Sequence, residues 1–457
     1  MPINPSIFKA YDLRGIYPDQ FNEEIAYLFS RAYVVFLQSF NPGKALSVVV
    51  SRDMRLSSDS LYAQIINGLT DQGADVIDIG LASTPSLYFN VAYFNYDGGL
   101  QITASHNPKE YNGLKVVRAR ALPVSGETGL FTIRDLIIQN NLPPASSTKG
   151  KVSSKPNDLD LLAEIQQKEW PINFSNIKPL KIVVDASNAL GIFDMEALLK
   201  PLNATVIKLN YTLDGTFPSH SSDPLNDANL DQLRQAVVAN NADIGLFPDG
   251  DCDRLFFVDN EGVTVRSDIL RGIMSQLVLK DYPHSSICYD IRPGKITSDM
   301  ISQSGGRPVV TRVGHSLIKE KMLEVDAPYG GESSGHHFFK FSFGTFEAPF
   351  IYAWKFLEYV SSQNKPISQI TKPFHVYFQS GEINSEVADK DAVMAKLQKL
   401  YPDGSVSTLD GITIEYPDFW FNVRPSNTEP LLRLNLEAKT QNLMEQKRDE
   451  ILAHIRS

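Results

Sequence analysis

The chain repeats one pattern three times, and this repetition limits the possible folds more than any other feature of the sequence. In each repeat an apolar strand ends at an aspartate, a helical stretch follows, and a second strand and a polar loop come later. The first strands end at Asp53, Asp185 and Asp290, and the second strands span 74–80, 204–209 and 307–312. Strands that alternate with helices are typical of α/β domains, in which ligands gather where the strands end.

Polar segments divide the chain into four predicted domains. The segment 146–156 is typical of a linker, 260–262 follows the second repeat, and 361–366 precedes a last segment of different pattern. We therefore expect an α/β fold in which three related α/β domains with mixed sheets and a smaller α+β C-terminal domain surround a central cleft. The expected domain ranges are 1–150, 151–259, 260–365 and 366–457.

The run Asp249-Gly-Asp-Cys-Asp-Arg254 places three carboxylates at alternate positions after a short apolar strand, 242–249. Residues two apart on a flat strand lie ~6.6 Å apart, so the backbone must curl to bring these carboxylates onto one hard cation. A solvated acidic turn is the alternative. An EF-hand is disfavoured, because Arg254 and Asn260 stand where that loop needs glycine and glutamate. Carboxylates beside open coordination positions favour Mg2+ that also holds a phosphate.

The composition excludes several classes of function. With 43 Lys and Arg against 53 Asp and Glu the net charge is −10, so no nucleic-acid partner is expected, although a local cationic pocket can still bind a small anion. Cys252 and Cys288 have no metal-binding or redox spacing. The N-terminus has no signal pattern and charged residues interrupt the long apolar stretches, so we expect a cytoplasmic protein with no membrane segment and no implied protein partner.

Ser105 lies in a polar loop, 103–108, in which Asn107 and Pro108 favour a turn. An isolated serine of this kind is ordinarily a turn or capping residue. A Ser/His/Asp hydrolase is disfavoured, because no Gly-x-Ser-x-Gly nucleophile elbow surrounds Ser105. The residue types alone therefore leave the role of Ser105 open.

Four loops in order resemble those of the α-D-phosphohexomutase family. Thr-Ala-Ser-His-Asn-Pro at 103–108, followed by Glu-Tyr-Asn-Gly-Leu-Lys at 110–115, is similar to the phosphoserine loop of that family. The resemblance begins at Tyr-Asp-Leu-Arg-Gly and covers nearly the whole chain. The N-terminal motif and the three further loops lie at 11–15, 249–254, 330–336 and 424–430.

The resemblance implies an enzyme that carries a phosphoryl group on Ser105. Arg254 would neutralise the oxygens of that group, and a salt bridge to the acidic residues is its alternative role. Lys115 and His336 would handle the proton of the attacking or departing hydroxyl, and His315 matches another active-site histidine. The implied ligands of Mg2+ are Ser105, Asp249, Asp251 and Asp253.

Other positions resemble the substrate contacts of the family. Glu332 and Ser334 match its sugar-hydroxyl contacts. A guanidinium, hydroxyls and turn amides can surround a phosphate without a metal, although a plain Pro/Asn turn is the alternative for this loop. The implied phosphate-binding residues are Arg424, Ser426, Asn427 and Thr428, with Arg433 behind them, and Tyr11 and Arg14 match a motif that lines the cleft. The four domains would thus supply, in order, the phosphoserine loop, the metal site, sugar recognition and phosphate binding.

The implied reaction interconverts mannose 1-phosphate and mannose 6-phosphate through a hexose 1,6-bisphosphate, with glucose phosphates as further substrates. Mannose is favoured because Asn427 resembles the mannose and glucose members of the family, whereas the glucosamine members usually carry glycine there. A phosphoglucosamine mutase, a haloacid-dehalogenase-type phosphatase with Asp249 as nucleophile, and a non-catalytic sugar-phosphate-binding protein are the alternatives. Ser333 and the aromatic run 338–346 depart from many relatives, and we expect the aromatic run to pack under the third domain and not to form a cofactor site.

Overall fold

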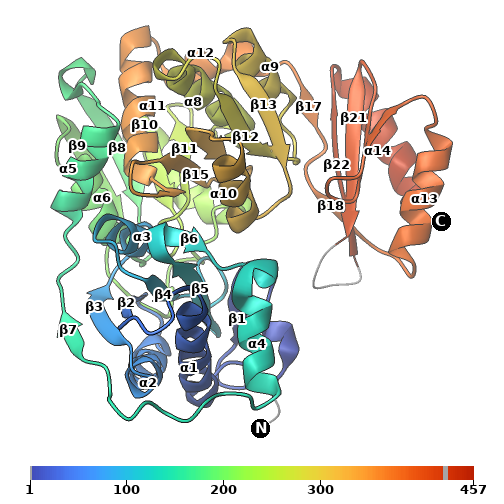
Figure 1. Ribbon diagram of the computed structural model, residues 1–457. Coiled ribbons are helices and arrows are strands. Elements are labelled where there is room, and N and C mark those ends of the chain that lie inside the picture. Colours follow the sequence, from blue (N-terminus) through green and yellow to red (C-terminus); the bar gives the residue numbers. More distant parts are fainter. Residues whose placement is uncertain (1–2, 426–430) are drawn as a thin grey trace. The chain divides into compact units, whose positions relative to one another are not determined.

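The computed structural model describes residues 3–425 and 431–457 of the chain. Two compact units make up this structure (Figure 1). One contains the residues up to Val265 together with Ser334–Ile370, and the other contains Arg266–Ser333 together with Thr371–Ser457. Across the described ranges, no helix combines the length and the apolar character needed to cross a bilayer.

The first sheet of the first unit is mixed and has the order β1-β5-β4-β2-β3-β7, with β6 paired to β5. Strand β2 is parallel to β3 and β4, whereas β5 is antiparallel to β4 and β1. Its strands are β1 (Leu13–Ile16), β2 (Ser47–Arg52), β3 (Asp75–Leu81), β4 (Gly98–Ile102), β5 (Tyr111–Arg118), β6 (Leu122–Pro123) and β7 (Val152–Ser154). The helices between them are α1 (Glu23–Phe40), α2 (Ser58–Asp71), α3 (Thr84–Tyr93) and α4 (Phe131–Ile138).

Helices cover both faces of this sheet, which explains the unbroken apolar run in β2. Val48 and Val50 belong to a core shared with α1 and α2. On the opposite face, Leu87 and Val91 of α3 lie against Gly99. The start of α1 is fixed where the side chain of Asn22 accepts a hydrogen bond from the backbone of the first turn, an N-cap that satisfies a free N–H.

The second sheet of this unit has the order β11-β10-β8-β9, with β8 parallel to β9 and β10, and β11 antiparallel to β10. Strand β10 lies between β11 and β8 and is buried along its whole length. The acidic run begins directly after this strand. The strands are β8 (Leu180–Asp185), β9 (Ala204–Leu209), β10 (Ile244–Pro248) and β11 (Leu255–Asp259), and the helices are α5 (Leu159–Glu169), α6 (Gly191–Leu199) and α7 (Asp231–Ala239).

Most aromatic side chains of the run 338–346 are buried, as expected for packing, but they pack within the first unit against α3 and Trp170 and not under the third predicted domain alone. Phe338, Phe339 and Phe346 have no exposed surface. Phe343 contacts Phe89 of α3 edge to face at 6.1 Å, and Phe339 contacts Trp170 in the same way at 5.1 Å. The elements of this segment are β15 (His337–Lys340), β16 (Thr345–Glu347), α11 (Pro349–Gln363) and α12 (Ile367–Thr371).

The first part of the second unit, Arg266–Ser333, contains the strands and helices of the third repeat. Strand β12 lies between β13 and β14 and is parallel to both. All of β12 is buried, in agreement with the apolar residues at its centre, Ile287, Cys288 and Tyr289. The strands are β12 (Ser286–Asp290), β13 (Arg307–Thr311) and β14 (Tyr329–Gly331), and the helices are α8 (Ser267–Asp281), α9 (Lys295–Gln303) and α10 (His315–Glu324).

The C-terminal part of the second unit is an antiparallel sheet with two helices packed on it. The sheet has the order β17-β22-β21-β20-β19, with β18 also paired to β22. Leu397 of α13 and Ile451 of α14 join the buried face of the sheet. The elements are β17 (Phe378–Gln379), β18 (Ile383–Glu386), α13 (Lys390–Leu400), β19 (Ser405–Ser407), β20 (Ile412–Glu415), β21 (Phe419–Pro425), β22 (Leu431–Ala438) and α14 (Gln441–Arg456).

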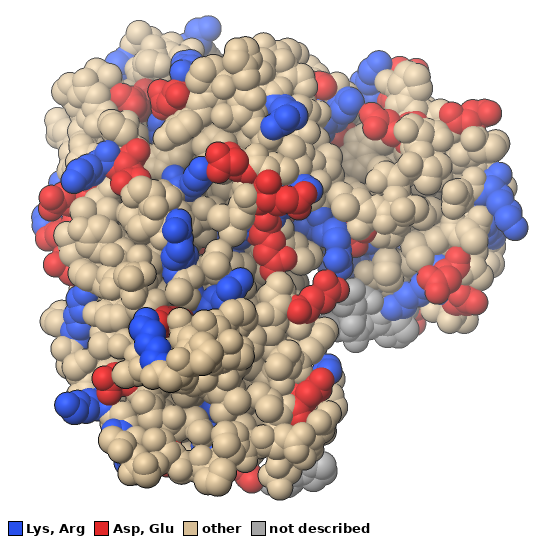
Figure 2. All heavy atoms as spheres, viewed as in Figure 1, with Lys and Arg blue, Asp and Glu red and all other residues tan. Residues whose placement is uncertain are grey.

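The predicted fold class, α/β with mixed sheets and an α+β C-terminal domain, is confirmed. The domain ranges stay a prediction. The contact pattern divides the third predicted range, 260–365, between the two units, because its last part packs with the first unit. On the face shown in Figure 2, acidic and basic side chains are interspersed, in keeping with the modest net charge.

Candidate active site

Ser105 lies in the loop that connects β4 to β5, and its backbone has the left-handed conformation with φ of 52°. This conformation is unfavourable for a residue with a side chain, so the surroundings must hold it. The Ser105 hydroxyl donates a hydrogen bond of 2.8 Å to Asp249 Oδ2, and the Ser105 amide donates to Thr103 Oγ1 at 2.9 Å. The loop therefore directs the Ser105 oxygen toward the acidic run.

The acidic run curls after β10 as its sequence predicts. Cys252 takes the left-handed conformation with φ of 62° and is fully buried as a small spacer. Gly250 passes so close to the Ser105 loop that a Cβ there would lie 2.5 Å from the carbonyl oxygen of Ser105. The curl brings one carboxylate oxygen from each of Asp249, Asp251 and Asp253 within 4.8 Å of the others.

The residues of this triad fit a divalent cation. All three are buried, and Oδ1 of Asp251 and Oδ1 of Asp253 accept no hydrogen bond from the described residues. Lys115 and Arg254 offset the charge of the three buried carboxylates only in part, and a hard cation with oxygen ligands would offset the rest. The Ser105 hydroxyl beside Asp249 can complete the ligand set.

Lys115 supplies positive charge to the triad. It projects from β5, and its Nζ lies 2.7 Å from Asp251 Oδ2 and also contacts Asp253. Burial lowers the pKa of Lys115, but the carboxylates of Asp251 and Asp253 outweigh it and raise that pKa above its usual range. Burial also raises the pKa of Asp249, while Lys115 and His336 overcome burial to hold the pKa of Asp253 well below its usual range. Lys115 therefore stays an ammonium at neutral pH.

His336 and Arg254 complete this side of the site. His336 Nε2 lies 3.3 Å from Asp253 Oδ1 and also 3.3 Å from Arg254 Nε, which donates to it. His336 Nδ1 lies 3.1 Å from the hydroxyl of Ser334. Arg254 Nε is 3.8 Å from Asp249 Oδ2, so the salt bridge weighed as its alternative role is present. Its Nη1 is buried and has no hydrogen-bond partner among the described residues. That free donor is available to an anionic ligand.

The N-terminal motif also reaches the Ser105 loop. Arg14 in β1 donates to Asn107 Oδ1, to the carbonyl oxygen of Ala104 at 3.4 Å, and to Asp12 at 2.7 Å. Burial lowers the pKa of Arg14, but Asp12 and Tyr11 outweigh it and raise that pKa. The structure thus brings ten predicted site residues together in the first unit: Tyr11, Arg14, Ser105, Lys115, Asp249, Asp251, Asp253, Arg254, Ser334 and His336.

Glu332 and His315 lie near each other in the second unit. Helix α10 begins at His315. The backbone N–H of Gly314, one residue before the helix, donates a hydrogen bond of 2.8 Å to Glu332 Oε1. Both Glu332 and His315 are buried. A carboxylate at the start of a helix is stabilised by the free N–H groups and the helix dipole, so this loop is held against α10.

Ser333, which departs from the family pattern, holds the same loop from the other side. The Ser333 hydroxyl donates a hydrogen bond of 2.8 Å to Asp290 Oδ1, and the Ser333 backbone N–H donates one of 3.1 Å to the same oxygen. Arg271 donates to the Ser333 hydroxyl at 2.9 Å and pairs with Asp290. Serine at this position therefore has a structural reason in this chain.

Arg424 and Arg433 lie opposite each other on β21 and β22 and share one carboxylate. Arg424 Nη2 lies 2.8 Å from Glu382 Oε2, and Arg433 Nη1 lies 3.4 Å from Glu382 Oε1. Arg424 Nε is buried without a hydrogen-bond partner among the described residues. Three predicted residues lie outside the described ranges: Ser426, Asn427 and Thr428.

Two polar neighbours of the triad loop escaped the sequence reasoning. Thr84, at the start of α3, donates its hydroxyl to Asp251 Oδ2 at 2.5 Å and its backbone N–H to the Asp251 carbonyl oxygen at 3.0 Å. His106 Nδ1 lies 3.2 Å from the Ser105 hydroxyl, and burial followed by the charge of Arg254 lowers its pKa well below the usual range. The Thr-Pro pair at 84–85, a helix start, was the available signal for Thr84.

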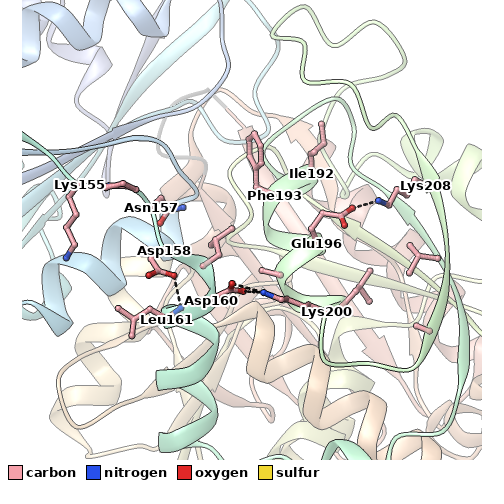
Figure 3. A pocket seen from close by; sticks show the side chains of 16 residues that line it. Lys155, Asn157, Asp158, Asp160, Leu161, Ile192, Phe193, Glu196, Lys200 and Lys208 are labelled. Atoms are coloured by element: carbon pink, nitrogen blue, oxygen red, sulfur yellow. Dashed lines mark hydrogen bonds and ion pairs between the residues drawn. The ribbon is translucent and has the colours of Figure 1, made fainter.

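A pocket of about 1080 Å3 lies elsewhere in the first unit and contains none of these residues (Figure 3). It is bordered by α5, α6 and β9, and four of its charged residues form two ion pairs. Lys200 contacts Asp160 at 2.6 Å, and Lys208 contacts Glu196 at 2.5 Å. Pocket size therefore does not locate the chemistry in this molecule.

Comparisons with known proteins agree with this arrangement. The chain matches the phosphoglucomutase/phosphomannomutase alpha/beta/alpha domains I, II and III over residues 5–142, 161–262 and 267–377, and the C-terminal domain over 382–454. It is 37% identical to a phosphomannomutase of Escherichia coli, over 98% of both proteins. A phosphomannomutase of Methanocaldococcus jannaschii is also 37% identical, over 97% of this chain and 96% of that protein.

A solved structure from Burkholderia thailandensis, a phosphoglucomutase/phosphomannomutase family protein, superposes with a TM-score of 0.87 at 30% identity, covering 99% of this chain and 97% of that one. The fold and the site define an isomerase of the phosphohexomutase class. The chain belongs to the phosphoglucomutase/phosphomannomutase family, as the loops at 103–108 and 249–254 indicated.

Proposed function

We propose that this protein is a phosphomannomutase that interconverts mannose 1-phosphate and mannose 6-phosphate through a phosphoserine at Ser105 and a hexose 1,6-bisphosphate. The observation that carries the proposal is the Ser105 hydroxyl, held 2.8 Å from Asp249 beside a buried carboxylate triad. The names of relatives 36% to 38% identical over nearly their full length support mannose as the sugar.

The Asp249, Asp251 and Asp253 carboxylates, together with the Ser105 oxygen, are the proposed ligands of Mg2+, which when bound would neutralise the phosphoryl oxygens. In the first half-reaction the bond from phosphorus to Ser105 Oγ breaks, and a bond to the free hydroxyl oxygen of the sugar phosphate forms. The hydroxyl proton passes to a base, and Ser105 leaves as an alkoxide that takes up a proton. The hexose bisphosphate then turns, and its other phosphoryl group returns to Ser105.

The contacts of Lys115, Arg254 and His336 support separate roles. Lys115 stays an ammonium and can neutralise charge on the transferred group. The Nη1 of Arg254, which no described residue contacts through a hydrogen bond, can bind one of the oxygens of that group. Because Lys115 stays an ammonium, the imidazole of His336, whose Nε2 lies 3.3 Å from both Asp253 and Arg254, is the proposed acceptor of the hydroxyl proton. We further propose that Glu332 and Ser334 contact sugar hydroxyls, and that His315 lies in the active site.

Arg424, Ser426, Asn427, Thr428 and Arg433 are the proposed ligands of the phosphate that does not react, with Tyr11 and Arg14 as further substrate contacts. The buried Nε of Arg424 supports this assignment, because a guanidinium can bind a phosphate through two parallel hydrogen bonds. Hexose phosphates are the proposed partners, and the cytoplasm is the proposed location.

The test combines intact-protein mass with a coupled assay on mannose 1-phosphate and glucose 1-phosphate. We expect a phosphoryl group on the wild-type chain after incubation with mannose 1,6-bisphosphate and Mg2+, and turnover that favours mannose. Ser105→Ala should lose both. Ser30→Ala, which removes a buried hydroxyl on α1, is the matched control and should keep both. Turnover by Ser105→Ala at the wild-type rate would overturn the proposal.

A further inference from the structure

Arg55, which follows β2, uses every donor of its guanidinium on one loop and one carboxylate. Its Nη1 donates to the carbonyl oxygens of Pro108 and Tyr111 at 2.7 and 3.0 Å. Its Nη2 donates to the carbonyl oxygens of Ser105 and Asn107 at 2.9 and 2.6 Å. The remaining donor, Nε, lies 3.1 Å from Asp53 Oδ2. A guanidinium has five N–H groups, so all of them are engaged.

The carboxylate of Asp53 is itself fixed. Asp53 Oδ1 accepts the backbone N–H of Arg55 at 3.0 Å and the hydroxyl of Ser58 at 2.6 Å. The Asp53 backbone N–H donates to Ile102 of β4 at 2.9 Å. Both Asp53 and Arg55 are 2% exposed, so the pair is buried and neutral overall. The guanidinium therefore has a fixed position relative to the sheet.

Other contacts hold the loop from 105 to 110 at single points, including the hydrogen bond from the Tyr17 N–H to the Glu110 carbonyl oxygen at 2.8 Å and the one from Arg14 to Asn107 Oδ1. Among the described residues, its internal hydrogen bonds are turns, from Asn107 to Ala104 at 3.0 Å and from Tyr111 to Pro108 at 3.0 Å. Ser105 has an unfavourable left-handed backbone, which needs support from outside the loop. Four carbonyl groups held by one cation provide that support.

We propose that Arg55 is a positioning residue for phosphoryl transfer, because it holds the 105–111 loop so that the Ser105 hydroxyl faces the acidic triad. The inference rests on the proposed function, in which Ser105 accepts and returns the phosphoryl group. Arg55 acts only through the backbone of Ser105 and its neighbours. A lysine has three donors and cannot hold four carbonyl groups, so the geometry requires arginine.

The test compares Arg55→Lys with the wild-type chain and with Arg52→Lys as a matched control three residues away. Rapid mixing with mannose 1,6-bisphosphate and Mg2+, followed by intact-protein mass, measures the rate at which Ser105 is phosphorylated. We expect this rate and kcat to fall on the order of 100-fold in Arg55→Lys, because small displacements of a reacting atom have effects of that size. The KM for mannose 1-phosphate and the affinity of the triad for Mn2+ should stay near their wild-type values, and Arg52→Lys should behave as wild type.

A purely structural role gives a different result. It would lower the folded fraction and the melting temperature, while each folded molecule would react at the wild-type rate. Phosphorylation of folded Arg55→Lys at that rate would overturn the inference. If Arg55→Lys does not fold, the same assay on Asp53→Asn tests the inference. This substitution removes the carboxylate that pairs with Nε of Arg55, while the side chain at position 53 keeps its size. There too a wild-type rate overturns the inference, and a loss of about 10-fold supports it.

Hydrogen exchange separates failure of the inference from failure of the proposed function. If the wild-type chain neither turns over mannose 1-phosphate nor accepts phosphate on Ser105, the proposed function is wrong. The amides of residues 103–111 still report on Arg55 in that case. Faster exchange there in Arg55→Lys, with unchanged exchange in β8 and β10, supports a positioning role, whereas unchanged exchange in the loop overturns it.

Discussion

The hydroxyl of Ser83, just before α3, donates a hydrogen bond of 2.7 Å to the buried carboxyl group of Asp194 on α6. Burial, followed by the charge of Asp251, raises the pKa of Asp194 to about 7, although the Ser83 hydrogen bond opposes the change. The folded chain therefore binds this proton more tightly than the unfolded chain does. The contribution of Asp194 to stability is fully present near pH 4 and is lost as the pH rises through about 7.

Asp194→Asn should therefore stabilise the protein at pH 8. The asparagine is neutral and can still accept the Ser83 hydrogen bond, so the gain in free energy of unfolding should reach up to about 4 kcal/mol and shrink toward pH 4. Thermal unfolding between pH 5 and pH 8 measures it. Asp214→Asn is the control, because Asp214 is on the surface and its pKa is lowered by Thr216. An equal effect of Asp194→Asn at both pH values would contradict the prediction.

Thr84→Val should weaken metal binding although it replaces none of the proposed metal ligands. The hydroxyl of Thr84 orients the Asp251 carboxylate across 2.5 Å, and loss of such an outer contact typically lowers metal affinity about 10-fold to 100-fold. Asp251→Asn should weaken binding further. Mn2+ titration by calorimetry or electron paramagnetic resonance measures both. Asp227→Asn, an exposed partner of Arg234, is the control, and an unchanged affinity in Thr84→Val would show that the hydroxyl has no orienting role.

Arg424→Ala should raise the KM for mannose 1-phosphate more than it lowers kcat. A charged hydrogen bond to a phosphate contributes about 1.5 to 3 kcal/mol, so we expect KM to rise about 10-fold to 100-fold. Steady-state kinetics with the coupled assay provide the measurement. Arg448→Ala on α14 removes a partly exposed arginine and should leave KM unchanged. A fall in kcat alone would contradict a role in binding the phosphate that does not react.

Trp170→Ala should destabilise the first unit by about 3 to 5 kcal/mol. Trp170 is 2% exposed, contacts Phe339 edge to face, and donates its indole N–H to the Lys340 carbonyl oxygen at 3.1 Å. Removal of this ring leaves a cavity between α5 and β15. Urea unfolding measures the change, with Phe193→Ala as the control, because Phe193 is 42% exposed. Equal effects of the two substitutions would show that the Trp170 contact is not what stabilises this unit.

The parts of the site that lie within one short segment could be predicted from the sequence. Three alternate carboxylates and the end of an apolar strand are local signals, and the curl of 249–254 follows from the geometry of the strand. The fold class could be predicted for the same reason, since each repeat shows its own apolar strand and helix. These features depend on residues near each other in the chain.

The residues that hold the site in place could not be predicted in this way. Thr84 meets Asp251 across a sequence separation of 167, and Arg55 meets the Ser105 loop across about 50 residues. Each alone is an ordinary helix-start threonine or an arginine near an aspartate. Only the packing of α3 and β2 against their neighbours gives them partners, so no local pattern marks them.

The division of the third repeat between the two units affects how the protein forms on the ribosome. Strands β15 and β16 and helix α11 pack with the first unit, yet residues 266–333 of the second unit are synthesised before them. Domains otherwise tend to fold in the order in which they are made. Here the first unit cannot be completed until residue 370 has been translated, so nascent chains that stop earlier expose the surface on α3 that Phe343 covers.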